Sequence, residues 1–104
     1  MNLATAESLA AALLDKDESL GTRDDAAMDL SEYDDAVALQ ALIQIAQDPN
    51  EDEMLHSSAG ESIGQIWHRK GEFNDALFDS FTRISRKEVA AAMGFKEKLA
   101  HRLR

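Results

Sequence analysis

The chain of 104 residues contains no cysteine, one proline and few aromatic residues. Without cysteine it forms no disulfide and has no thiolate nucleophile, so we expect a reducing, cytoplasmic location. No apolar run approaches the roughly 20 residues needed to cross a bilayer. The apolar stretch Leu9 to Leu14 follows Glu7 and no basic residue, so a secretory signal is not expected either.

Alanine and leucine dominate the composition, and β-branched residues are scarce. This mixture favours helix over strand. Apolar residues make up 44% of the chain, which is ordinary for a globular protein, and the length suits a single core. We therefore predict an all-α protein with one domain, residues 1–104.

Apolar residues recur at helical spacing in six segments. The segment that ends at Gln47 is apolar on most sides, which predicts the most buried helix. Gly60 and Gly64 lie four residues apart in the next segment, which indicates that another helix approaches closely there. Thr22 and Asn74 are the expected caps of the second and fifth helices, and Gly94 is expected to break the last. The expected helices span about 5–15, 22–33, 35–47, 51–69, 74–84 and 86–102.

No pattern of catalytic or metal-binding residues emerges. The three histidines do not converge, and we expect each at the surface: His56, His68 and His101. The segments Asp15-x-Asp17-x-Ser19 and Asp48-x-Asn50-x-Asp52 have the spacing of calcium ligands, but alanine occupies the twelfth position, where a glutamate is required. No phosphate-binding loop or nucleophile motif is present. The sequence thus predicts no enzyme, no metal and no cofactor.

Charge is distributed unevenly. The formal net charge is −9, but residues 83–104 carry seven basic and two acidic side chains, a net +5. Residues 1–82 carry 18 acidic and four basic side chains, a net −14. Such a surface repels nucleic acid and anionic membranes and accelerates encounter with a basic protein. We expect a basic protein partner, although a merely solvated surface is the simpler alternative.

A helical pattern occurs twice. Arg23-x-x-Ala26-Ala27-x-x-Leu30 precedes an apolar helix and Asp48-Pro49-Asn50, and Ala59-Gly60-x-x-Ile63 repeats its core 33 residues later. His56 stands where the first copy has Arg23, and Arg86-x-x-Val89-Ala90 starts a third, incomplete copy. These residues resemble HEAT-like repeats of the type found in phycobilisome-lyase-like proteins. The resemblance implies a short right-handed α-solenoid of about six helices.

In scaffolds of this type the second helix of each pair lines a concave face that binds a partner. Trp67 is a candidate interface anchor, with a buried cap between the fourth and fifth helices as the alternative. The polar positions expected on that face and in its turns are Asp34, Asp35, Gln40, Gln44, Asp48, Glu72, Asp75 and Asp79.

Small size, strong acidity and a stand-alone binding scaffold are similar to bacterial toxin-immunity proteins. We therefore expect an antitoxin that neutralises a basic toxin domain, possibly a nuclease, by occluding its active site. An adaptor or assembly factor for a non-toxin partner is the alternative, and a lyase-like or chaperone role is a third hypothesis.

Overall fold

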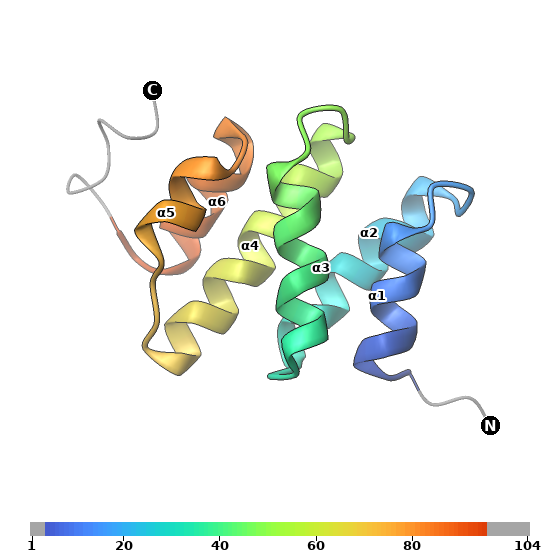
Figure 1. The fold of residues 1–104 in the computed structure, drawn as a ribbon, viewed down its shortest axis with the longest axis horizontal. Helices are drawn as coiled ribbons and strands as arrows, with labels where there is room; N and C mark the ends of the chain where they lie inside the picture. The colour runs from blue at the N-terminus through green and yellow to red at the C-terminus, as the bar shows by residue number, and fades with distance from the viewer. Residues whose placement is uncertain (1–3, 96–104) are drawn as a thin grey trace.

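Six α-helices and one 3-10 turn, without any strand, make up residues 4–95, the part of the chain described by a computed structural model (Figure 1). The all-α prediction is therefore confirmed for these residues. The elements are α1 (Ala6–Leu14), α2 (Leu20–Asp29), the 3-10 turn η1 (Leu30–Glu32), α3 (Ala36–Gln47), α4 (Glu53–Lys70), α5 (Asp75–Ser80) and α6 (Arg83–Ala92).

The helices form two layers. Helices α1, α3 and α5 lie towards the viewer in Figure 1, and α2, α4 and α6 lie behind them. The longest helix, α4, packs against α2, α3 and α6 and is the centre of the fold. The expectation that α3 is the most buried helix is wrong. Although α4 is less apolar, its small residues let neighbours approach on several sides, and ten of its residues are buried.

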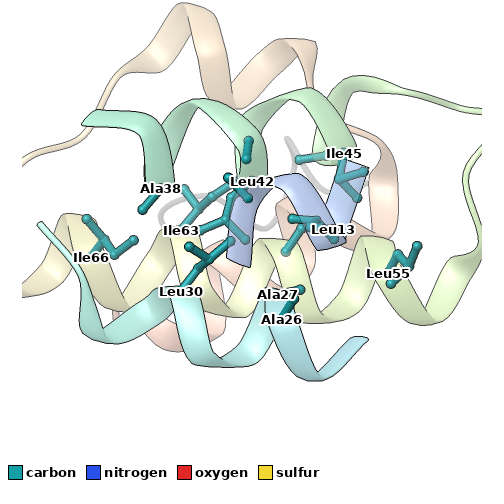
Figure 2. Close-up of a cluster of buried hydrophobic side chains, with 14 of the residues drawn as sticks. Leu13, Ala26, Ala27, Leu30, Ala38, Leu42, Ile45, Leu55, Ile63 and Ile66 are labelled. Carbon is teal, nitrogen blue, oxygen red and sulfur yellow. The ribbon is translucent and has the colours of Figure 1, made fainter. Parts of the chain in front are cut away.

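The core lies between the layers. Figure 2 shows large aliphatic side chains from α1, η1, α3 and α4, together with alanines of α2, gathered in one cluster. Leu13, Leu42 and Ile63 are each 0% exposed at this junction. Burying a side chain of this size contributes roughly 1.5–3 kcal/mol, so this cluster stabilises the packing of the two layers.

Gly60 and Gly64 hold α6 close to α4, as the sequence predicts. A Cβ at position 60 would lie 2.5 Å from the Ser85 carbonyl oxygen, and one at position 64 would lie 2.6 Å from the Ala92 Cβ. These separations are shorter than van der Waals contact. The helix-weakening effect of the two glycines is therefore offset by backbone packing that no larger residue allows.

Several helix ends differ from those expected. Ser19, rather than Thr22, caps α2, because its hydroxyl oxygen accepts the Thr22 N–H at 3.1 Å. The fifth helix ends at Ser80, and Thr82 caps a helix that begins three residues earlier than predicted. Gly94 has a φ of 75° and follows the end of α6, so the predicted break is confirmed. The rest of the last predicted helix, with His101, lies outside the described residues.

The α1–α2 and α3–α4 turns have the same geometry, 33 residues apart. In the first, the Asp15 carboxylate accepts the Asp17 N–H at 2.9 Å. In the second, the Asp48 carboxylate accepts the Asn50 N–H, also at 2.9 Å. Each turn ends at the N-cap of the following helix, namely Ser19 and Asp52. The calcium-like spacing in the sequence therefore belongs to a repeated helical hairpin turn.

Arg23, the fourth residue of α2, is buried in this fold. Its Nε–H donates to the Leu13 carbonyl oxygen at the end of α1, at 2.8 Å. Its two terminal nitrogens donate to the Glu51 carboxylate at 3.2 and 2.6 Å. One guanidinium therefore joins α1, α2 and the α3–α4 turn.

His56 and Arg86 repeat the first of these contacts from the same position in their own helices. His56, the fourth residue of α4, donates from Nε2 to the Asp48 carbonyl oxygen at 2.6 Å. Arg86, the fourth residue of α6, donates to the Phe81 carbonyl oxygen. Each donor satisfies a carbonyl at the C-terminal end of the preceding helix, which would otherwise lack a partner. The expectation of a surface His56 is wrong, since only 4% of it is exposed.

Candidate protein-binding surface

The predicted glutamines lie on the outer side of α3. Gln40 and Gln44 are exposed one turn apart. Gln47 continues this row and donates to the Ser80 hydroxyl at 2.9 Å, which links α3 to α5. Helix α3 carries no charged residue. Its outer side is therefore a neutral strip on an otherwise acidic molecule.

Three of the predicted acidic residues have basic partners within the fold. Arg69 lies 2.6 Å from Asp34, and its hydrogen bond holds the pKa of that carboxyl below its usual value. Lys16 lies 3.6 Å from Asp48. Lys70 lies 3.8 Å from Glu72. Asp35 is exposed at the start of α3, and Asp75 and Asp79 are exposed on α5, where each also takes part in an interaction within the molecule.

Trp67 is not an exposed anchor. Only 2% of it is accessible, because it packs between two phenylalanines. Its ring stacks on Phe81 with centroids 6.0 Å apart and meets the edge of Phe73 at 5.4 Å. The buried-cap alternative is correct, and the interpretation of Trp67 as a partner-binding residue is withdrawn.

The surface is hollowed on the other layer, on both sides of α4. A hollow of about 280 Å³ lies between α4 and α6 and is lined by Glu61, Gln65, Glu88, Ala91 and Ala92. A second hollow, of about 220 Å³, lies between α2 and α4. Glu61 and Gln65 line both and form the ridge between them. Pockets for small ligands usually measure about 300–1,000 Å³ and enclose the ligand, so these open hollows are smaller than a typical small-ligand pocket.

Helix α2 and η1, which form one wall of the second hollow, also carry a row of exposed carboxylates. Asp25, Asp29 and Glu32 are exposed on α2 and η1 at spacings of four and three residues, which place them on one side. Met28 lies beside them, 50% exposed, and lines the hollow. In the sequence these carboxylates have the same spacing as Gln40, Gln44 and Gln47 on α3, which is the signal that identifies the row. We name the hollow together with these four residues the α2–α4 groove.

Hydrogen bonds fix the two walls of the α2–α4 groove. The Ser62 hydroxyl donates to the Ala27 carbonyl oxygen at 2.7 Å. The Ser58 hydroxyl donates to the Asp24 carboxylate at 2.6 Å. Both serines belong to α4 and both acceptors to α2, so the distance between the helices is set before any partner arrives.

Charge changes sign across this layer. The carboxylate row on α2 lies at one end, and the exposed side chains of Arg83 and Lys87 lie on α6 at the other (Figure 1). Opposite ends of the layer therefore attract opposite charges, and a charged molecule approaching it would be oriented.

Residues 4–95 contain no group of three or more histidine, cysteine, aspartate or glutamate side chains arranged to hold a metal ion. In the same part of the chain, no helix combines the length and apolar character required to cross a membrane. No family model, curated protein or solved structure matches the chain.

Proposed function

We propose that this chain is an immunity protein: an acidic helical domain that binds a basic toxin domain, such as a nuclease, and covers its active site. The row Asp25, Asp29 and Glu32 carries this proposal. These carboxylates are exposed and form no ion pair with any residue of the described part of the chain. They are therefore available to the lysine and arginine side chains of another protein.

The row would act chiefly on the rate of association. Complementary charges steer two proteins together and raise the association rate, whereas apolar contacts made after docking slow dissociation. Exposed charges are screened over about 8–10 Å at physiological salt. We therefore expect salt to reduce the association rate of the complex more than it raises the dissociation rate.

We propose that the scaffold is a short right-handed solenoid of three helical hairpins, similar to HEAT repeats. The matching turns that begin at Asp15 and Asp48 support this arrangement. The donors Arg23, His56 and Arg86, each fourth in its helix, support it independently. Repeats that stack in this way present continuous surfaces to a partner.

We propose a cytoplasmic location, based on the absence of cysteine, and a role in binding without catalysis or a cofactor. A specific observation favours the adaptor as a second candidate. The neutral strip of Gln40 and Gln44 on α3 can hydrogen-bond to a partner of either charge.

The experiment that separates these functions begins with capture of the partner from a host lysate and its identification by mass spectrometry. An immunity protein should capture a basic protein encoded directly upstream of its own gene. Expression of that protein should arrest growth, and co-expression of this chain should restore it. Capture of a harmless protein from another locus would reject the immunity function and support the adaptor.

A further inference from the structure

We infer that the α2–α4 groove is the docking site for the basic partner, and that the partner inserts one apolar side chain beside Met28 with lysine or arginine side chains around it. The inference rests on the proposed function only in taking the partner to be a basic protein. It adds which face of the chain binds the partner, which kinds of side chain the partner contributes, and that Met28 makes the central contact.

The groove combines the two contacts that a basic amphipathic segment needs. Met28 is half exposed and forms an apolar surface against the hollow. Asp25 and Asp29 are exposed on α2 and Glu32 on η1, the elements that carry Met28 and Ser31 of the hollow, and Glu61 on α4 lines it from the opposite wall. An apolar side chain in the hollow would therefore have carboxylates on both sides of it.

The neighbouring surfaces lack this combination. The α4–α6 hollow is not lined by a large apolar side chain, and Arg83 and Lys87 are exposed on the same helix as its outer wall. The α3 strip has no charge to attract a basic segment. Charge complementarity therefore selects the α2–α4 groove.

The groove also requires little rearrangement on binding. The hydrogen bonds from Ser58 and Ser62 to α2 fix the spacing of its walls. Loss of conformational freedom opposes association, so a preformed groove binds more tightly than one that must be ordered.

The test is an NMR titration of the isotopically labelled chain with a synthetic amphipathic peptide made of lysine and leucine. A second peptide, in which glutamine replaces leucine, provides the charge without the apolar side chain. We expect the largest amide shifts at Met28, Ser31, Ser62 and Gln65, and clearly weaker binding of the glutamine peptide.

Two matched pairs of variants sharpen the test. Met28→Ala should weaken peptide binding about fivefold, as expected for losing burial of half a methionine side chain. Met54→Ala should change it less than about twofold, because Met54 is equally exposed but lines neither hollow. Reversing two charges in the row, D25K/D29K, should weaken binding about tenfold more than D17K/E18K, which makes the same change of net charge in the α1–α2 turn.

Equal effects of the two methionine variants would overturn the inference. Shifts centred on Gln40 and Gln44, or no binding of the lysine–leucine peptide, would do so as well. None of these results bears on whether the chain protects a cell from a toxin, which the growth assay measures separately. Conversely, groove binding without growth protection would reject the immunity function and leave the docking site established.

Discussion

Replacing Arg23 by methionine tests whether the buried guanidinium stabilises the fold. Methionine keeps much of the side-chain length but removes the donors to the Leu13 carbonyl oxygen and to Glu51. The side chains of Arg23 and Glu51 are only 8% and 6% exposed. Glu51 would retain a backbone hydrogen bond from Asp52 and the cation of Lys16, which lies 3.7 Å away and is 67% exposed.

Removing one partner of a fully buried ion pair costs about 3–5 kcal/mol because the other charge is left unpaired. Lys16 and the solvent at the edge of the turn compensate in part, so we expect R23M to lower the free energy of unfolding by about 2–3 kcal/mol. For a domain of this size that corresponds to a fall in Tm of about 10–20 °C. Thermal and urea unfolding followed by circular dichroism would measure it.

Arg69→Met is the matched control. The Arg69–Asp34 distance is also 2.6 Å, but these side chains are 42% and 67% exposed. Exposed pairs contribute little, so R69M should change Tm far less than R23M. Similar falls in Tm for the two variants would refute the argument that burial determines how much stability is lost when one partner of an ion pair is removed.

The pH dependence of the stability difference between wild type and R23M tests the Arg23–Glu51 pair a second time. The Arg23 hydrogen bond holds the pKa of Glu51 below its ordinary value of 4.5 in the folded state. This contribution to stability is complete above the unfolded-state pKa and is lost as the pH falls through the folded-state pKa. The Tm difference between wild type and R23M should therefore be constant at neutral pH and shrink below about pH 4.5. A difference that grows on acidification would contradict the assignment.

Two further predictions concern stability, each measured by urea unfolding. Gly64→Ala should destabilise the protein by about 1–3 kcal/mol, because its Cβ overlaps α6. Gly21→Ala should stabilise it by about 0.5 kcal/mol, because no atom lies within 4 Å of a Cβ at that position in α2. If both substitutions changed the free energy of unfolding in the same direction, close packing at Gly64 would not be the cause. His56→Ala should cost about 1–3 kcal/mol by leaving a carbonyl at the end of α3 without its donor. His68→Ala, at an exposed position of the same helix, should be nearly neutral, and equal losses would refute the role of His56.

Helical spacing was sufficient to predict the all-α class and the close approach at Gly60 and Gly64. It did not distinguish which helix is central, because a polar residue of α4 such as Ser58 resembles a solvated position in the sequence. Only in the fold does its hydroxyl donate to an acceptor on α2. His56 was wrongly expected at the surface because the contact of its side chain also forms only in the fold. Its imidazole donates to a carbonyl eight residues away, across a turn.

The candidate site was predicted less well than the fold. The acids chosen from the turns included Asp34, Asp48 and Glu72, which have basic partners inside the molecule. Those pairs join residues brought together only by folding or by a turn, so composition does not reveal them. The exposed row on α2, represented by Asp25 and Asp29, was visible in the sequence but was not among the predicted partner-binding residues.

The turn that occurs at both Asp15 and Asp48 has a consequence for how such a chain could gain a further hairpin during evolution. The hairpin ending in α2 and the hairpin ending in α4 each have their own Asx turn, their own N-cap and a buried donor at the same helical position. These features are encoded within each copy, 33 residues apart. Duplication of one such segment would therefore carry its turn and internal hydrogen bonds with it, and selection would need to adjust only the packing where the new copy meets its neighbours.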